Sequence, residues 1–267
     1  MESLVKTATG VSESLQENDI DENYIQYLKD MPSSYYNAMT MEYGLNIKNN
    51  LFTNTQTGLI HEGIDYKTAQ YSISGITNIC TTILENCRGG EYKSFSSMVD
   101  GYTNAFGQCI DNEEYVLSQY NVVAGTYPHE ANELMVVLNH QNEVTEFVLT
   151  LLGYYGQEEF ANAIYYFSND GKEGTYDKEL WAKQQSIDVS KLVGKEYTYY
   201  PNDSVFKKNP SYNDPDASPL DKTVYQPFFY DYLDTGNLQN GMKMKVTGVL
   251  TPKENVRYGC LSSGLFY

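Results

Sequence analysis

The clearest pattern along the chain is an alternation of apolar and polar residues over residues 38–48. The apolar members are Met39, Met41, Tyr43, Leu45 and Ile47. A period of two predicts a strand with one buried face. Residues 49–63 are polar and turn-like, residues 66–75 predict a second strand, and residues 76–84 are compatible with a helix or a strand.

Helical spacing recurs in four segments. Residues 21–31 begin with acidic side chains, as a short helix often does. Residues 94–110 predict an amphipathic helix. Its apolar positions are Phe95, Met98, Val99, Tyr102, Phe106 and Cys109. Two further helices are expected over residues 158–167 and 176–184.

Residues 120–155 contain the densest succession of predicted elements. An extended segment over 120–123 leads to a Gly–Pro turn over 125–128, and the continuous apolar run 134–138 indicates a central strand. The helix that follows is expected to begin at Asn142 and to end at Gly153.

The last part of the chain predicts two strands around a long loop. Residues 196–200 form a Tyr-rich strand, and residues 201–222 are rich in Pro, Asn, Asp and Ser, which predicts a loop. Residues 242–250 alternate as a half-buried strand that Pro252 ends.

An aromatic stretch at residues 225–233 precedes that last strand, and it is the candidate ligand or partner surface. Its members are Tyr225, Phe228, Phe229, Tyr230 and Tyr232. These side chains either line an apolar groove for a peptide or lipid-like ligand or cover the core beneath the long loop. The sequence leaves both interpretations open.

Together these elements predict an α+β fold, with a mixed or mostly antiparallel sheet and packed helices in two lobes. Residues 1–20 are expected to be a tail or stalk, residues 21–119 a first lobe, and residues 120–267 a second lobe. Strands are allowed to interleave across the boundary at residue 120.

Composition narrows the classes of partner. Hydrophobic residues make up 41% of the 267 residues and charged residues 20%, which indicates a globular chain. The net charge of −17 argues against nucleic acid and anionic membranes, but permits cationic ligands and Ca²⁺. The 26 tyrosines favour broad half-buried surfaces, with or without a ligand.

The hydropathy pattern bears on location. No apolar run approaches the roughly 20 residues that span a bilayer, and the first residues lack the apolar core of a signal peptide. The chain is therefore expected to be cytoplasmic or a piece of a longer protein. The apolar ending SSGLFY favours a piece.

Catalytic motifs are missing from the sequence. It has neither a phosphate-binding G-x-x-x-x-G-K-[ST] loop nor a G-x-S-x-G nucleophile turn. The three histidines, His61, His129 and His140, are interpreted as surface or turn residues. An unrecognised pair of carboxylates, as in a hydrolase, stays open as a third hypothesis.

Metal-binding and disulfide signals are also sparse. Asp214 and Asp216 are the best calcium candidates, and a solvated acidic loop is the alternative reading. The cysteines fit no zinc motif, and predict either one disulfide within the first half or buried free thiols. They are Cys80, Cys87, Cys109 and Cys260.

Three ordered segments resemble a known family. They read YNVVAG-TYP with NELMVV over residues 120–137, LVGKEY over 192–197, and KVTGVLTPK over 245–253. The set resembles the extracytoplasmic domain of MacB/FtsX-like ABC transporter permeases of Gram-positive bacteria. Asn121 stands where that family usually has Asp, and Tyr127 stands where it has an aromatic residue.

The resemblance covers residues 120–267, where Gly259, Gly264 and Tyr267 are similar to the family's closing Gly-rich strand. It implies a non-enzymatic domain inserted between the first two transmembrane helices, on the extracellular face of the cell membrane. No cofactor would bind this domain, because ATP and Mg²⁺ would bind the separate ATPase.

The partners that the resemblance implies are the ABC ATPase and the transmembrane helices of the same permease, with a peptide, lipoprotein or cell-wall protein outside. A secreted or surface-attached module that binds peptide or glycan is the alternative function.

Overall fold

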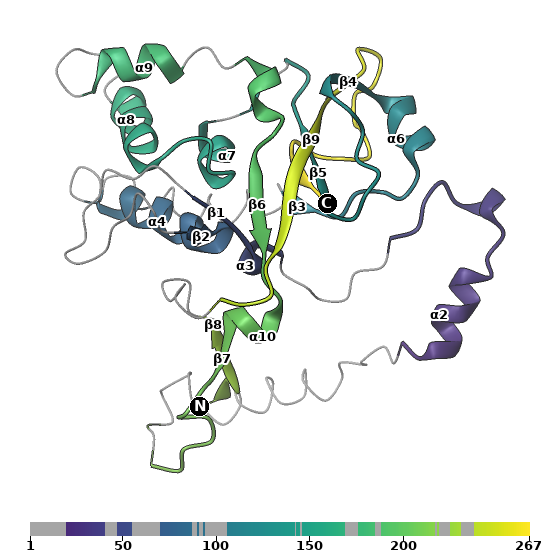
Figure 1. The fold of residues 1–267 in the computed structure, drawn as a ribbon, viewed down its shortest axis with the longest axis horizontal. Coiled ribbons are helices and arrows are strands. Elements are labelled where there is room, and N and C mark those ends of the chain that lie inside the picture. Colours follow the sequence, from purple (N-terminus) through teal and green to yellow (C-terminus); the bar gives the residue numbers. More distant parts are fainter. Residues whose placement is uncertain are drawn as a thin grey trace, which may run out of the picture. The chain divides into compact units, whose positions relative to one another are not determined.

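The computed structural model describes most of the chain. The described residues are 20–40, 47–54, 70–86, 90, 93, 106–141, 143–144, 146–168, 176–184, 188–216, 218, 225–230 and 238–267. The chain divides into two compact units, Met1–Met39 and Thr40–Tyr267. Figure 1 shows the elements of both units.

The described part of the first unit is a short helical segment. Helix α2 (Glu22–Lys29) is followed by the 3-10 turn η1 (Ser33–Tyr35). The backbone N–H of Tyr24 donates to the Asp21 carboxylate at 2.8 Å, which caps the helix and lowers the pKa of that carboxyl. The predicted helix over residues 21–31 is confirmed.

The second unit is built on a mixed sheet of eight strands, so the α+β prediction is confirmed. Seven strands follow the order β2-β1-β6-β9-β5-β10-β3, and β4 pairs with β9. The strands are β1 (Leu51–Asn54), β2 (Gln70–Ser72), β3 (Phe106–Gly107), β4 (Tyr120–Gly125), β5 (Glu133–Val137), β6 (Glu196–Tyr199), β9 (Met242–Pro252) and β10 (Gly264–Phe266). Strands from both sides of residue 120 thus share one sheet.

Strand β9 is the centre of this sheet. Strand β5 pairs with it in parallel along one edge, while β6 and then β4 pair with the opposite edge in antiparallel fashion. The register shifts beside Thr247, because Leu134 pairs with Val246 and Met135 pairs with Gly248. This extra residue is a bulge, and it lets Val246 and Val249 face the same core.

Strand β5 is buried on both faces, as its continuous apolar run predicts. Leu134 and Val136 face one core cluster, which also contains Val148 and Leu149. Met135 and Val137 face a second cluster. The second cluster consists of Val116, Tyr120, Tyr127, Met135, Val137, Leu250, Leu261 and Phe266.

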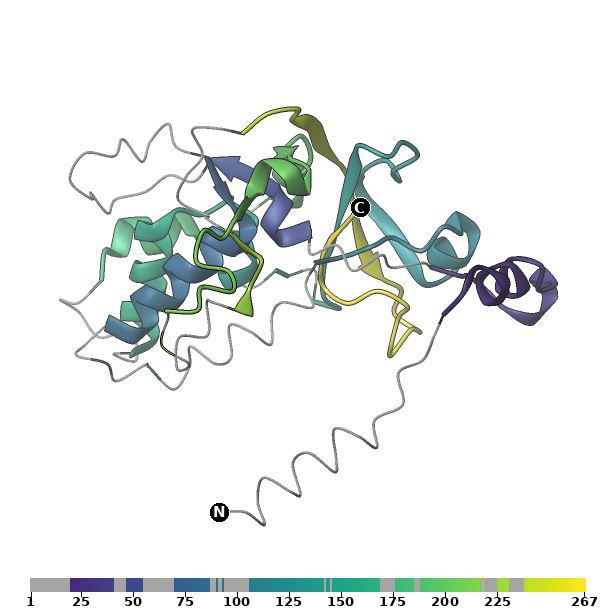
Figure 2. The same cartoon turned by 90° about the horizontal axis from the view of Figure 1, so that it is seen from below.

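Several helices cover the first face and one another. They are α3 (Ile47–Asn50), α4 (Ile73–Asn86), α7 (Glu146–Leu151), α8 (Gln157–Ser168) and α9 (Lys178–Gln184). A third apolar cluster joins α4 to α8 through Ile76, Cys80 and Phe160. Figure 2 shows the blue and green helices of this group together on one side of the strands.

The opposite face carries helix α6 (Glu113–Gln119), which contributes Val116 to the second cluster. This helix was not among those predicted from the sequence. Asn112 caps the helix, because its side chain accepts from the N–H of Tyr115 at 3.0 Å. The predicted helices over 158–167 and 176–184 and the predicted strand over 242–250 are confirmed.

Two strong periodic signals were wrong wherever the structure describes them. Residues 38–40 are not in a strand, Ile47–Asn50 form a helix, and the intervening 41–46 lie outside the described residues. The strand lies just beyond, at β1, in a stretch expected to be turn-like. Leu51 and Phe52 are buried there, so tertiary packing overrides the local polarity.

The helix expected over residues 94–110 was wrong at its described end. Phe106 and Gly107 form β3, which pairs in parallel with Leu265 and Phe266. A pairing partner this distant in the sequence cannot be read from local spacing. Residues 94–105 lie outside the described residues.

The loop expected over residues 201–222 is partly structured. It contains helix α10 (Asn202–Val205) and strand β7 (Phe206–Lys208). Strand β7 pairs with β8 (Phe228–Tyr230) as a separate two-stranded sheet, called here the aromatic ribbon. None of the helices in the described ranges is long and apolar enough to cross a membrane.

Candidate functional site

The aromatic residues singled out in the sequence lie on and beside the aromatic ribbon. Tyr225, Phe228 and Phe229 are exposed, by 65%, 58% and 37% respectively. Tyr230 is half-buried, and Tyr232 lies outside the described residues. The interpretation that this stretch covers the core was therefore wrong for the three exposed side chains.

Tyr230 anchors the ribbon to the rest of the unit. Its ring packs within the ribbon against Phe206 of β7, with 5.5 Å between centroids. Its hydroxyl hydrogen-bonds to the Ser72 hydroxyl, which also accepts from the N–H of Gly75 at the start of α4. The ribbon is thus held at one position by a tyrosine, although the neighbouring phenylalanines face solvent.

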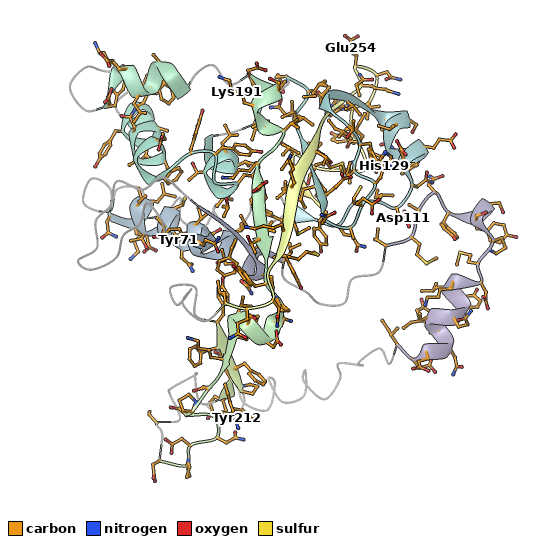
Figure 3. The ribbon with its side chains drawn as sticks, in the orientation of Figure 1. Tyr71, Asp111, His129, Lys191, Tyr212 and Glu254 are labelled. Atoms are coloured by element: carbon orange, nitrogen blue, oxygen red, sulfur yellow. The ribbon has the colours of Figure 1, made fainter. Side chains whose placement is uncertain are left out.

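Asn209 fixes the far end of the ribbon. Its side-chain amide donates to the carbonyl of Gln226 at 2.9 Å, and its backbone N–H donates to the carbonyl of Pro227 at 3.0 Å. Figure 3 shows Tyr212, which follows this end and is itself exposed, well apart from His129, which lies between β4 and β5.

Phe228 and Phe229 point to opposite faces of the ribbon, because successive side chains of a strand alternate. Lys208 pairs with Phe228, and Lys207 pairs with Phe229. Exposed apolar side chains that lie next to one another often mark a contact surface in soluble proteins. The ribbon can therefore offer apolar contact on both faces.

The three segments that carry the family resemblance meet at β9. The first forms β4 and β5, the second precedes and forms β6, and the third is β9 itself. Gly125 pairs with Gly248, and the N–H of Thr126 then donates to the carbonyl of Thr247 at 2.9 Å. The closing stretch similar to the family's Gly-rich strand includes β10, from Gly264 to Phe266.

The second segment is also hydrogen-bonded to β9. The N–H of Gly194 donates to the carbonyl of Val246 at 2.8 Å, and the N–H of Val246 donates to the carbonyl of Lys195 at 2.9 Å. Gly194 has a φ of 93°, which a glycine adopts without the steric cost of a Cβ. The motif glycines therefore shape the backbone around β9.

Lys195 links the segment beside β9 to the end of α7. Its ammonium donates to the carbonyl of Gly153 at 2.8 Å and lies 5.7 Å from the ring centroid of Tyr154 and 5.9 Å from that of Tyr197. Gly153 ends the helix with a φ of 69°, as predicted. Burial lowers the pKa of Lys195.

The tyrosines around Lys195 also bond backbone carbonyls, one of them at the end of helix α7. The hydroxyl of Tyr197 donates to the carbonyl of Leu152 at 2.8 Å, and that of Tyr154 donates to the carbonyl of Leu192. Burial raises the pKa of both phenols. These contacts satisfy backbone carbonyls, so they account for the lysine and both tyrosines as structural residues.

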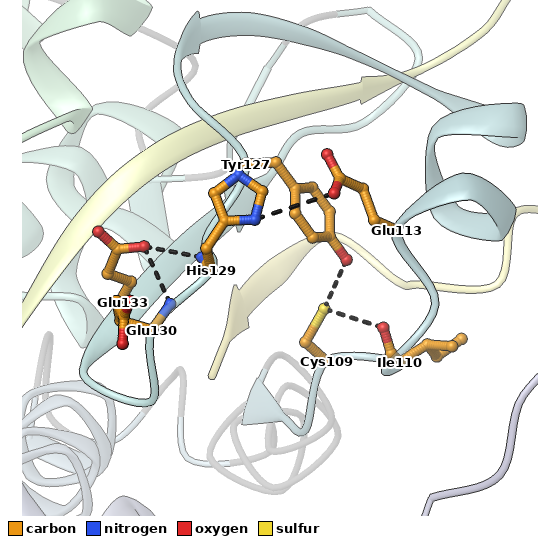
Figure 4. Close-up of polar contacts among 7 residues, drawn as sticks. All are labelled: Cys109, Ile110, Glu113, Tyr127, His129, Glu130 and Glu133. Carbon is orange, nitrogen blue, oxygen red and sulfur yellow. Dashed lines mark hydrogen bonds and ion pairs between the residues drawn. The ribbon is translucent and has the colours of Figure 1, made fainter.

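A cluster of polar residues lies around the turn after β4 (Figure 4). The sequence did not predict that these residues are neighbours. The thiol of Cys109 lies 3.1 Å from the hydroxyl of Tyr127. The ring of His129 lies 3.8 Å from the carboxylate of Glu113, and both side chains are well exposed. Glu133 accepts from the N–H of His129 at 2.8 Å, which closes the turn.

This cluster lacks the features of an activated nucleophile. Burial is the main cause that raises the pKa of the Cys109 thiol, and it also raises that of the Tyr127 phenol. Both groups are therefore protonated near neutral pH. His129 contacts Glu113 rather than the thiol, so no base is placed to accept the thiol proton within this group.

The remaining sequence candidates are distributed over the surface. His129 and His140 are exposed, as predicted, and His61 lies outside the described residues. Asp214 and Asp216 are exposed, and the Asp214 carboxylate accepts from the N–H of Asp216 at 2.9 Å. Among the described residues, no group of three or more metal-ligating side chains lies together.

The described cysteines are free thiols. Cys80 is buried in the third apolar cluster, while Cys109 and Cys260 are partly buried beside the second. Comparison with known proteins adds no relative, because no family model, no curated protein and no solved structure matches the chain.

Proposed function

We propose that this chain is a non-catalytic extracellular domain of an ABC transporter permease, which couples ATP hydrolysis in the cytoplasm to export or to mechanical action outside the membrane. The observation that carries the proposal is the meeting of the three resembling segments at β9. These segments lie far apart in the sequence, yet their glycines and one lysine make the backbone contacts that surround β9.

This arrangement fits a part that transmits force. Strand β9 is hydrogen-bonded along both edges, and β5 beside it is buried on both faces. Because closely packed interiors are stiff, a displacement applied to one strand of this centre moves its neighbours with it. In this proposal the residues of the three segments serve rigidity, and none of them supplies a reacting group.

The partners follow from the same proposal. ATP and Mg²⁺ bind a separate ABC ATPase, and the transmembrane helices of the permease carry its motion to this domain. A peptide, lipoprotein or cell-wall protein receives that motion outside. The net charge of −17 disfavours nucleic acid as a partner.

The first test is the reading frame that encodes this chain. An apolar segment of about 20 residues before the chain and three after it would support the permease. A secretory signal with no later span would overturn it.

Tyr258, which is 83% exposed, supplies a second test through the substitution Tyr258→Cys in the full-length protein. A membrane-impermeant maleimide should label this variant above the parent chain in intact cells, whereas labelling only after lysis would contradict an extracellular domain.

A module that binds peptide or glycan is the second candidate, and the exposure of Tyr225, Phe228 and Phe229 favours it. Aromatic rings supply large contact areas at a small entropic cost. Titration of the chain with peptide and glycan libraries should then detect binding that Phe228→Ala removes. Tyr258→Ala is the matched control, since that ring is exposed on a different segment. Equal binding by both variants would exclude the ribbon as the site.

A further inference from the structure

Two cysteines that are far apart in the sequence pack on the same apolar cluster. Cys109 and Cys260 both contact the second cluster, the one that contains Tyr120 and Tyr127. Both thiols are partly buried rather than enclosed. Cys80 differs, because it is fully buried in the third cluster, beside α4 and α8.

Cys109 is held at the end of β3. Its backbone N–H donates to the carbonyl of Tyr267 at 2.7 Å, which extends the pairing of β3 with β10. Its thiol lies 3.1 Å from the Tyr127 hydroxyl (Figure 4). The sulfur therefore has a fixed position at the edge of the cluster.

Cys260 is held by α6 and β4, which precede it by 141 residues. Its N–H donates to the side-chain carbonyl of Gln119 at 2.9 Å. The next residue, Leu261, donates its N–H to the Tyr120 hydroxyl at 2.9 Å and accepts from the same hydroxyl at 2.6 Å. Residues 253–263 around it form no helix or strand, so this cysteine is not part of a ladder of backbone hydrogen bonds.

Tyr127 brings the two thiols into one environment. Burial is the main cause that raises the pKa of the Tyr127 phenol and of the Cys260 thiol; the charge of Cys109 raises both further, and that of Cys260 adds to the shift of Tyr127. Partly buried groups are screened less by salt and water than exposed ones, so each responds to the charge of its neighbours. The electrostatics thus agree with the shared packing.

We propose that Cys109 and Cys260 are a redox-active pair that closes into a disulfide through exchange with a small disulfide such as oxidised glutathione. One cysteine thiolate attacks a sulfur of that molecule and displaces one thiol. The other cysteine thiolate attacks the mixed disulfide and displaces the second. The two cysteines lose two electrons and two protons, and the small disulfide becomes two thiols.

The bond would fasten residues 253–263 to the end of β3. It would also remove the thiol partner of the Tyr127 hydroxyl, in the turn that follows β4. Because burial raises the pKa of both thiols, closure should be slow near neutral pH and faster in mildly alkaline buffer. The inference does not depend on the permease proposal, since it concerns the chemistry of the folded chain.

The test uses the whole chain with Cys80→Ser and Cys87→Ser, so that only the proposed pair remains. Oxidised glutathione should lower the intact mass by two hydrogens, abolish alkylation of both cysteines and raise Tm by several degrees. A reductant should reverse all three changes. Digestion of the oxidised wild-type chain should yield one linked peptide containing Cys109 and Cys260.

Single variants separate this inference from nonspecific oxidation. Adding Cys109→Ser or Cys260→Ser to the same background should abolish the loss of two hydrogens and leave a glutathione adduct on the remaining cysteine. Circular dichroism would establish that each variant is folded. Glutathione adducts on both cysteines of the pair, or disulfide-linked dimers, would overturn the proposal.

Discussion

Gly125 lies directly opposite Gly248 in the antiparallel pairing of strands β4 and β9. A Cβ on Gly248 would lie 2.2 Å from the carbonyl oxygen of Thr126, and a Cβ on Gly125 would lie 2.0 Å from that of Thr247. Both neighbours are backbone atoms, so neither side chain could be accommodated without moving a strand.

Substitution of either glycine should therefore be costly. We expect Gly248→Ala to lower the free energy of unfolding by about 3 kcal/mol, as overpacking against a fixed backbone does. Gly125→Ala should cost at least as much, because Gly125 also has a φ of 69°. Urea denaturation of the purified variants measures both values.

Gly194→Ala is the matched control for these two substitutions. Its φ of 93° is unfavourable for alanine, but the nearest atom to the added Cβ is the Cε atom of the flexible Lys245 side chain, at 3.9 Å. Strain without a clash should cost about 1 kcal/mol. A loss as large as that of Gly248→Ala would show that close approach is not the deciding cause.

The ammonium of Lys195 supports the end of α7 through the carbonyl of Gly153. Lys195→Met keeps the length of the side chain and removes the donor, so we expect a loss of about 1 kcal/mol in the free energy of unfolding. Lys191→Met, on the exposed neighbouring turn, should change stability by less than about 0.5 kcal/mol. Equal effects in thermal or urea unfolding would argue against the capping role.

Stability should fall in alkaline solution because buried phenols have raised pKa values. Tyr120, Tyr127, Tyr154 and Tyr197 are all raised from the ordinary value of 10.0. A group whose pKa is higher in the folded state stabilises fully below its unfolded pKa, and loses that contribution as pH rises above it. Lys195, with a lowered pKa, acts in the opposite direction.

The comparison of urea unfolding at about pH 8 and about pH 11 measures this loss, with up to about 1.4 kcal/mol from each tyrosine per pH unit above 10. Tyr197→Phe should reduce the alkaline loss, although it is less stable near neutral pH because the bond to the Leu152 carbonyl is missing. An unchanged alkaline loss in that variant would contradict Tyr197 as a contributor.

The aromatic ribbon offers a contrast between an exposed and an anchoring ring. Phe228→Ser should change the free energy of unfolding by less than about 0.5 kcal/mol, because 58% of that residue is exposed. Tyr230→Ala should cost about 2 kcal/mol, since it removes packing on Phe206 and the bond to Ser72. The reverse order would mean that the phenylalanine, and not the tyrosine, holds the ribbon.

The parts of the fold that could be predicted from the sequence are those with self-sufficient local patterns. The apolar run of β5 indicates burial on both faces, and the end of α7 at Gly153 follows from a glycine adopting positive φ. The alternation in β9 reads correctly from Met244 to the bulge at Thr247, where one extra residue reverses the faces, but Met242 is exposed.

The parts that could not be predicted depend on distant partners. Phe106 has helical spacing to its neighbours, but β10 imposes a strand on it. The exposure of Phe228 could not be foreseen, because nothing in its local sequence distinguishes a covering ring from a projecting one. The approach of Cys109 to Tyr127 likewise depends on how the turn after β4 folds back.

The position of β9 in the chain also has a consequence for synthesis on the ribosome. Translation proceeds from the N-terminus, so β4, β5 and β6 emerge before the strand at residues 242–252 with which all three pair. Until then the apolar edges of β5 have no strand partner in β9, and nascent chains with unpaired strands are prone to aggregate. The growing chain is therefore expected to depend on chaperones until β9 has been made.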